Sequence, residues 1–216
     1  MRVILVTGFE PFTPHKVNPT EDLARGLDGW RAGAALVRAA ILPVHHADAA
    51  ARVRELLPEI EPAAVLHLGL AAGRARIALE RVGVNVMDYA VPDNAGCQMT
   101  DEPCVPGGPP AYFATLPLRE ILGRMTTAGV PAYISDTAGT YLCNQTLYTT
   151  LHAVADRADA PRVGFIHMPL SQAMVAATGL DQPSMDLAVM RRGVEIALET
   201  LLEHLGEGLG GKSQLQ

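Results

Sequence analysis

Residues 35–70 read ALVRAAILPVHHADAAARVRELLPEIEPAAVLHLGL, and the spacing of their apolar side chains indicates the fold class. Ala35–Val44 is rich in Val, Leu and Ile, as expected for a strand, whereas His46–Ile60 spaces its apolar side chains as a helix does. Ala64–Leu70 follows as a short apolar run, typical of a strand that is buried on both faces. A strand, a helix and a second strand in this order indicate a parallel pair joined by a right-handed crossover.

The same alternation continues along the chain on both sides of this stretch. Further strands are expected at Val3–Thr7, Arg76–Val86, Pro131–Thr137 and Arg162–Met168. Further helices are expected after Pro19, with Thr20 as the N-cap, and near Tyr112–Ala128, Asn144–Arg157 and Ser184–Leu205. The sequence therefore predicts a three-layer α/β/α sandwich with a mostly parallel, twisted central sheet.

The domain organisation is equally simple. No internal repeat and no linker divides the chain, so residues 1–205 are expected to form a single domain and residues 206–216 a flexible tail. One stretch breaks the alternation: Val91–Pro110 is rich in Pro, Gly, Asp and Asn and is too long for a simple connection. Long loops in compact domains are often functional, so this loop is a candidate for a role at a site or a subunit contact.

The composition excludes several classes of protein. The formal net charge is −6 with acids and bases interspersed, and the absence of a basic stripe argues against a nucleic-acid partner. No amphipathic face rich in Lys and Arg, and no apolar run long enough to span a bilayer, suggests a membrane. The N-terminus is apolar only from Val3 to Val6, too short for a signal peptide, so a cytoplasmic protein is expected. Cys97 and Cys104 have no second pair to complete a zinc site, so no metal is expected.

Cys143 is the first candidate for chemistry, within SDTAGTYLCNQTLY at residues 135–148. A free cysteine is most often a small buried hydrophobe. Here, however, a loop feeds a helix at the cysteine, and N–H groups at a helix N-terminus lower the pKa of a thiol and can stabilise an oxyanion. Cys143 is therefore either a core residue or a nucleophile, and a nucleophile would need a base.

His167 is the best-placed base among the seven histidines. It ends the strand VGFIH, which is expected to lie next to the strand that leads to Cys143. His67, by contrast, lies mid-strand among apolar residues and is interpreted as a core histidine with a hydrogen-bond partner.

A third group should orient the imidazole of His167. Glu80 lies in a mostly apolar segment, where an unpaired carboxylate is costly, although Arg76 or Arg81 would provide a purely structural partner. Spacing alone does not choose among the four candidate acids, Glu80, Asp88, Asp93 and Asp136.

Two phenylalanines, Phe9 and Phe12, follow the first strand in GFEPF, although the chain has only four. They either pack in the core or form a flat apolar wall for a small ring-shaped group. The stretch GLAAGR at residues 69–74 matches neither a dinucleotide nor a Walker motif, so the sequence has no nucleotide fingerprint.

Nine motifs, in order, resemble those of the pyroglutamyl-peptidase I family (cysteine peptidase family C15), and they cover the chain from Val3 to Pro169. They are TGFEPF, NPT, GLAAGR, LERVGVN, VPDNAG, GGPPAYFATLP, GVPA, SDTAGTYLCN and GFIHMP. The resemblance implies an α/β/α sandwich and a cytosolic cysteine peptidase that removes the N-terminal pyroglutamyl residue from peptides. It also implies that the enzyme needs no cofactor and is a homo-oligomer, often a tetramer.

The resemblance further implies a catalytic triad. Cys143 matches the nucleophile, His167 the general base and then acid, and Glu80 the acid that orients the histidine. The positions that match the substrate pocket of the family are Phe9, Phe12, Asn18, Tyr141 and Leu142.

Two positions depart from the pattern of the family. Some relatives carry Gln where this chain has Leu70, and many carry Arg, thought to lie close to the reacting carbonyl, where it has Ala90. These departures keep one alternative open, a catalytically weak or inactive protein that binds pyroglutamyl peptides. A second alternative is an enzyme like the nucleoside phosphorylases, which would need a phosphate site.

Overall fold

The computed structural model describes residues 2–32, 35–179 and 181–207, and its centre is a sheet of seven strands. The strand order is β2-β3-β1-β4-β9-β5-β8. The four parallel strands are β3 (Ala35–Leu42), β1 (Arg2–Phe9), β4 (Ala64–Leu70) and β9 (Arg162–Met168). The other three are β2 (Arg31–Ala32), antiparallel to β3, β5 (Ile77–Glu80), antiparallel to β9, and β8 (Ala132–Ser135), parallel to β5.

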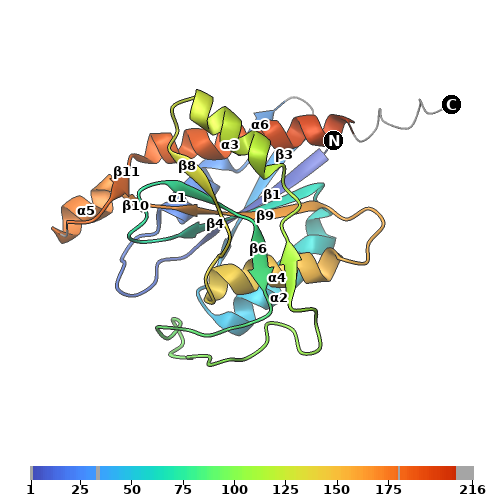
Figure 1. Cartoon of the computed structure of the whole chain (residues 1–216), viewed down its shortest axis with the longest axis horizontal. Helices are drawn as coiled ribbons and strands as arrows, with labels where there is room; N and C mark the ends of the chain where they lie inside the picture. The colour runs from blue at the N-terminus through green and yellow to red at the C-terminus, as the bar shows by residue number, and fades with distance from the viewer. Residues whose placement is uncertain (1, 33–34, 180, 208–216) are drawn as a thin grey trace.

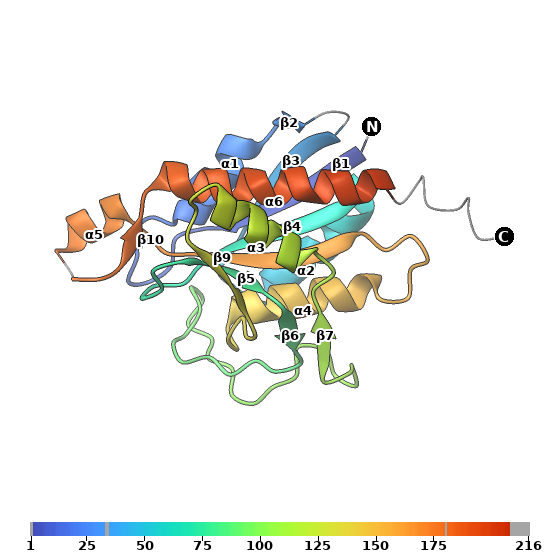
Figure 2. The same cartoon turned by 45° about the horizontal axis from the view of Figure 1, so that its top comes forward.

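Helices cover both faces of this sheet, which confirms the three-layer prediction (Figures 1 and 2). One face carries α1 (Pro19–Leu27), α3 (Leu118–Thr127) and α6 (Leu187–Glu207), and the other carries α2 (His46–Ile60) and α4 (Leu142–Val154). Successive side chains of β1 point to opposite faces of the sheet. Ile4 packs in the core under α1, α3 and α6, and Leu5 packs in the core under α2 and α4. Strand β1 is therefore buried on both faces, as its unbroken apolar run predicts.

Two predicted boundaries are wrong, and both concern the region around Arg81. The expected single strand Arg76–Val86 is two strands, because the chain leaves the central sheet at Arg81 and continues as β6 (Val82–Val84). Strand β6 pairs with β7 (Ala111–Phe113), so the segment expected to begin a helix at Tyr112 is extended there. The side chain of Asn144 bonds to both N–H and C=O of Val84 and so ties β6 to α4, a long-range contact that local spacing does not encode.

The position of β5 corrects a second expectation. Strand β9, which ends in His167, is not next to β8, which leads toward Cys143, because β5 lies between them. Strand β5 runs antiparallel to β9 and brings Glu80 opposite Phe165. The strand that leads to the candidate nucleophile thus lies one place further from the candidate base than predicted.

The start of α1 is also different from the prediction. Asn18, not Thr20, is the N-cap, and its Oδ1 accepts from the Thr20 N–H at 3.1 Å and from the Thr20 hydroxyl at 2.8 Å. Thr20 lies instead in the first turn, where it is fully buried.

The chain after β9 contains short elements that the sequence did not indicate. They are β10 (Leu170–Ser171), α5 (Gln172–Thr178) and β11 (Ser184–Met185), and they project from one end of the sheet (Figure 1). Helix α6 runs to Glu207, and the rest of the expected tail, residues 208–216, lies outside the described residues. Within the described ranges, no helix is both long enough and apolar enough to cross a membrane.

Candidate active site

Cys143 lies in the first turn of α4, directly after the N-cap residue Tyr141 and Leu142. Tyr141 has an extended backbone, and its side chain makes no capping hydrogen bond within the described chain. The first N–H groups of a helix have no partner inside it, so those of α4 are available to an anion beside the thiol. The cysteine is partly exposed and free, as a nucleophile must be.

Gly69 makes room for the sulfur of this cysteine. A Cβ built on Gly69 would lie 3.0 Å from Cys143 Sγ and 2.6 Å from the Phe165 ring, so any larger residue would displace one of them. Gly69 also pairs with His167 in the parallel register of β4 and β9. Paired residues of neighbouring strands project to the same face, so Cys143 and His167 meet on the α4 side of the sheet.

His167 is held by Glu80, although the two residues are far apart in the chain. Its Nδ1 lies 2.7 Å from Glu80 Oε1, and both residues are buried. Because a carboxylate accepts, Nδ1 carries the proton in the neutral ring, and Nε2 is left as the basic nitrogen. Of the four candidate acids, the structure brings Glu80 to His167 through the pairing of β5 with β9.

Burial dominates the electrostatics of the pair Cys143 and His167. It lowers the pKa of His167, against the opposing effect of the Glu80 hydrogen bond and charge, so the imidazole is neutral at pH 7. Burial and then the charge of Glu80 raise the pKa of the Cys143 thiol to about 12, with Arg74 opposing them. The backbone N–H at the helix N-terminus does lower this pKa, as expected, but desolvation of the thiolate outweighs its contribution.

A pocket opens beside the sulfur at the carboxyl ends of β1, β3 and β4, where open α/β sheets bind ligands. Its lining consists of Phe9, Phe12, Asn18, Val44, Leu70, Tyr141, Leu142 and Cys143. The structure thus brings together all five residues that the resemblance assigns to the pocket. Val44 and Leu70 are additions that the analysis of the sequence did not assign to it.

Asn18 lines this pocket and is also held by the protein itself. Its Oδ1 accepts from Thr20, and its Nδ2 donates one hydrogen to Glu10 O at 3.1 Å. Asn18 is also only 2% exposed, which makes it a support of the β1–α1 connection that carries Phe12.

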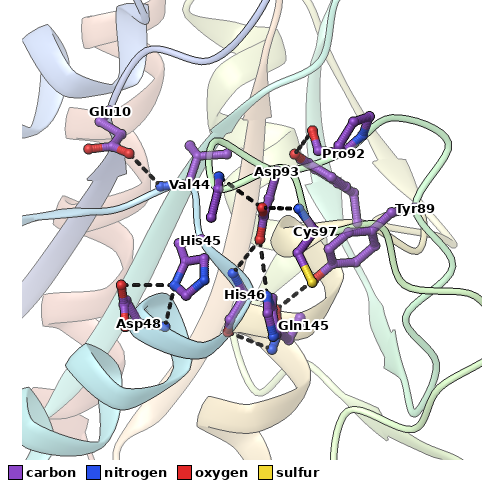
Figure 3. Close-up of polar contacts among 12 residues, drawn as sticks. Glu10, Val44, His45, His46, Asp48, Tyr89, Pro92, Asp93, Cys97 and Gln145 are labelled. Carbon is purple, nitrogen blue, oxygen red and sulfur yellow. Dashed lines mark hydrogen bonds and ion pairs between the residues drawn. The ribbon is translucent and has the colours of Figure 1, made fainter.

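Asp93 does not act on His167, because it serves as an anchor for the long loop (Figure 3). Its Oδ2 accepts from the His46 N–H and lies 3.0 Å from His46 Nδ1, and its Oδ1 accepts from the N–H groups of Ala95 and Cys97. Burial would raise the pKa of Asp93, but the hydrogen bonds from His46 and Cys97 lower it to about 2. Asp93 thus fastens the loop to the start of α2 as a permanent anion.

The loop in turn supports one wall of the pocket. Tyr141 donates from its hydroxyl to Pro92 O at 3.2 Å, and its ring packs against Tyr89 with centroids 4.6 Å apart. Glu10 Oε1 accepts from Val44 N and from Asn94 Nδ2 and so joins the loop to the strand ends (2.9 and 3.0 Å). The long loop, for which the sequence predicts a role at a site, thus supports the pocket wall from behind.

One group of side chains could in principle hold a metal ion. His45, His46 and Asp93 bring potential ligand atoms within 4.8 Å of one another, the single such group found in the described part of the chain. The four lone pairs of Asp93 already face four N–H donors, and His45 Nδ1 lies 2.8 Å from Asp48 Oδ2. The geometry is that of a hydrogen-bonded anchor at the start of α2 rather than of a metal centre.

Arg74 is the functional candidate that the sequence analysis missed. Its Nη1 lies 2.7 Å from Glu80 Oε1, whereas the two arginines considered as partners of Glu80 have other contacts. Arg81 pairs with Asp136, another candidate acid, at 2.8 Å, and Arg76 lies over the Tyr133 ring. The available signal was the position of Arg74 in GLAAGR, directly after the strand that neighbours β9.

Three further residues singled out in the sequence are His67, Leu70 and Ala90. His67 is confirmed as a core histidine, bonded to Thr7 at 2.7 Å and to Thr150 at 2.9 Å. Leu70 is buried in the pocket lining, whereas Ala90 is exposed.

Comparison with known proteins gives a consistent result. A family model described as pyroglutamyl peptidase matches residues 1–204. Pyrrolidone-carboxylate peptidase from Pyrococcus furiosus is 44% identical over 205 residues, with 94% of this chain and 99% of the relative covered. The same-named protein of Deinococcus radiodurans is 43% identical over 206 residues, covering 93% and 94%. Crystal structures of the pyrrolidone carboxyl peptidase from Pyrococcus furiosus superpose with a TM-score of 0.91 at 43% identity, over 94% of this chain and 99% of theirs.

Proposed function

The chain belongs to the pyroglutamyl peptidase family, and from that premise we propose how its residues release the N-terminal pyroglutamyl residue of a peptide. Cys143 is the nucleophile, His167 the general base and then the general acid, and Glu80 the group that holds the imidazole in its working tautomer. The observation that carries this assignment is the 2.7 Å contact of His167 Nδ1 with Glu80, on the face of the sheet where Cys143 Sγ lies over Gly69.

The first half of the reaction forms a tetrahedral intermediate. His167 Nε2 takes the thiol proton as Cys143 Sγ attacks the carbonyl carbon that links pyroglutamate to the next residue. Because the pKa of the resting thiol is raised, this proton transfer accompanies the attack rather than preceding it. Glu80 stabilises the imidazolium that results.

The second half releases the products. The first N–H groups of α4 hold the oxyanion of the tetrahedral intermediate, which collapses as the C–N bond breaks and His167 donates its proton to the leaving amine. Water then attacks the thioester with His167 as base, and the free thiol is restored as pyroglutamate leaves. No step needs a metal or a cofactor.

The absence of charged side chains from the pocket lining explains why it would prefer pyroglutamate to an ordinary N-terminal residue. The eight lining residues include no acidic or basic side chain, so nothing there pairs with the ammonium group of an ordinary N-terminus. Pyroglutamate has a neutral lactam instead, and its flat ring fits between aromatic and aliphatic walls supplied by Phe9, Phe12, Tyr141 and Leu142. A prolyl amide, with a ring of the same size but a charged amine, is therefore the matched control substrate.

The experiment uses a fluorogenic pyroglutamyl amide, with reductant and without added metal. We expect the wild type to release the fluorophore, Cys143→Ala to lose at least about a thousandfold in kcat/KM, and Cys97→Ala to keep its activity. The prolyl, glutamyl and glutaminyl amides should be poor substrates. Full activity in Cys143→Ala, or comparable turnover of the prolyl amide, would refute the assignment of the nucleophile or of the pocket, respectively.

Two finer points belong to the same proposal. A homo-oligomer, the tetramer that the family resemblance implies, agrees with the exposure of large apolar side chains, above all Phe113 at 72%. Light scattering of the purified protein, with Phe113→Ser beside the wild type, tests this. A cytoplasmic location is proposed on the resemblance alone, and fractionation of cells tests it. A pyroglutamyl-peptide binder without activity is not favoured, since the relatives are named as peptidases.

A further inference from the structure

Arg74 and His167 share one oxygen of the buried carboxylate at the site. Arg74 Nη1 and His167 Nδ1 each lie 2.7 Å from Glu80 Oε1. The second oxygen, Oε2, is the one buried side-chain polar atom without a hydrogen-bond partner in the described ranges. Every polar contact of Glu80 thus passes through a single atom, and Arg74 supplies half of them.

Glu80 depends on this arrangement for its charge. The side chain has no exposed surface, and a carboxylate removed from water stays ionised only when an opposite charge compensates it. A guanidinium is always protonated in proteins, whereas the imidazole of His167 must lose its charge in order to act as a base. Arg74 is therefore the permanent counter-ion of Glu80, and His167 is a temporary one.

Resting on the proposed function, we propose that Arg74 is a positioning residue that neutralises part of the Glu80 charge and thereby keeps His167 unprotonated at neutral pH. Without Arg74, the full negative charge of Glu80 would fall on the imidazole and favour the imidazolium, which cannot accept the thiol proton. The role is electrostatic and acts through Glu80, and Arg74 is not among the residues that line the pocket.

The surroundings of His167 contain few other groups that could produce the same effect. Glu80 contacts it from β5, and Arg74, in the segment after β4, contacts the same oxygen of Glu80. Cys143 of α4 lies over Gly69, the register partner of His167, and the Phe165 ring packs 4.7 Å away. His67 on β4 is bonded to two hydroxyl groups and is uncharged. Burial, and to a smaller degree Arg74, lowers the pKa of His167, and Glu80 raises it, in agreement with the geometry.

The first test is the pH dependence of kcat/KM for hydrolysis of a pyroglutamyl aminocoumarin. In Arg74→Gln we expect the acidic limb to move up by about one pH unit, the lower end of what an adjacent charge produces. Arg74→Lys should restore the limb, because a single contact to one oxygen requires the charge and not the fork of arginine. The control is Arg81→Gln, which removes an exposed arginine bound to Asp136 and should leave the profile unchanged.

The second test does not require peptidase activity. In a Cys143→Ala background, the His167 resonance, assigned with His167→Gln, is titrated by NMR with and without Arg74→Gln. We expect the pKa of His167 to rise by about one unit when Arg74 is replaced. This result would support the inference even if the pyroglutamyl amide were not a substrate, so the two proposals can fail separately.

Three results would overturn the inference. One is an unchanged acidic limb of kcat/KM in Arg74→Gln. A purely structural role of Arg74 would lower the activity without moving this limb. Another is a pKa of His167 that stays the same or falls in the titration. The third is an acidic limb of kcat/KM that shifts by a full pH unit in Arg74→Lys, although this variant keeps the positive charge. If Arg74→Gln does not fold, the profile of Arg74→Lys is sufficient as the test.

Discussion

Two buried histidines lie on the same face of the sheet, on the neighbouring strands β4 and β9, and they have opposite roles. His67 bonds to Thr7 through Nδ1 and to Thr150 through Nε2. Because Thr150 donates its hydroxyl proton to Thr146 O, it must accept from His67 Nε2–H, and Thr7 then donates to Nδ1. Both ring nitrogens of His67 are consumed, so this ring has nothing left for chemistry.

His167 lies two residue pairs further along the ladder, on the same face, and is paired with Gly69, which has no side chain. Its one bond to a carboxylate fixes the tautomer and leaves Nε2 as the unprotonated, basic nitrogen. Burial lowers the pKa of both rings, but Glu80 opposes this for His167, whereas the pKa of His67 falls to about 3. Both rings are buried, so the difference comes from their partners. His67 lies between two hydroxyl groups and is structural, whereas His167 lies beside a carboxylate and can act as a base.

The largest expected effect is the loss of the base. His167→Gln should reduce kcat/KM by about 10³ to 10⁴, the upper part of the range of about 10² to 10⁴ typical of general acid–base catalysis, with little change in the midpoint of thermal unfolding. Hydrolysis of the pyroglutamyl amide and differential scanning fluorimetry check the two parts. If the variant kept more than about a tenth of the wild-type rate, another group would have to be the base.

Replacement of the Glu80 carboxylate should reduce the rate somewhat less than loss of the base. Glu80→Gln keeps the shape of the side chain but lets the amide donate to His167 and so select the wrong tautomer, and we expect a loss of about 10² to 10⁴ in kcat. KM should change little, because Glu80 does not line the pocket. Steady-state kinetics separate the two parameters, and a change confined to KM would contradict this role.

His67→Gln should affect stability and spare the chemistry. The variant leaves at least one of the buried hydroxyls of Thr7 and Thr150 without its partner, which we expect to lower the free energy of unfolding by about 2 kcal/mol. Urea unfolding measures this change, and kcat/KM at 25 °C should stay within about threefold of the wild type. A loss of activity as large as that of His167→Gln would remove the distinction between the two histidines.

The last expected effect is a dependence of stability on pH. The pKa of His67 is 6.5 in the unfolded chain and about 3 in the folded one, so below pH 6.5 only the unfolded state gains a proton. Stability should therefore be unaffected above pH 6.5 and fall as the pH drops from 6.5 toward 3, by up to about 1.4 kcal/mol per pH unit from this residue. His167, whose pKa is also lowered, adds to the same slope.

Urea titrations at pH 7, 6 and 5 measure this slope, and His67→Gln is the control. Above pH 4 the variant should lose the part of the dependence that His67 contributes and keep the part from His167, while Asp93, with a pKa lowered to about 2, does not yet contribute. An identical slope in the two proteins would mean that His67 is hydrated or protonated in the folded state.

Much of the architecture could be predicted from short-range patterns alone. The expected bounds of α2, β4 and β9 agree with the structure residue for residue, because apolar spacing within one element reports its period and its burial. The same patterns placed Cys143 at the start of a helix, His167 at the end of a strand, and His67 inside the core. Each of these properties depends on side chains only a few positions apart.

Partnerships across the sheet could not be predicted in this way. Four acids remained possible for His167 because Glu80 reaches it only through the insertion of β5 between β9 and β8, which no spacing in the chain encodes. Arg74 was missed for the same reason, and the raised pKa of the Cys143 thiol follows from how deeply neighbouring elements bury it. Local sequence specifies periodicity and chain ends, whereas strand order and desolvation arise from contacts between residues that meet only when the chain folds.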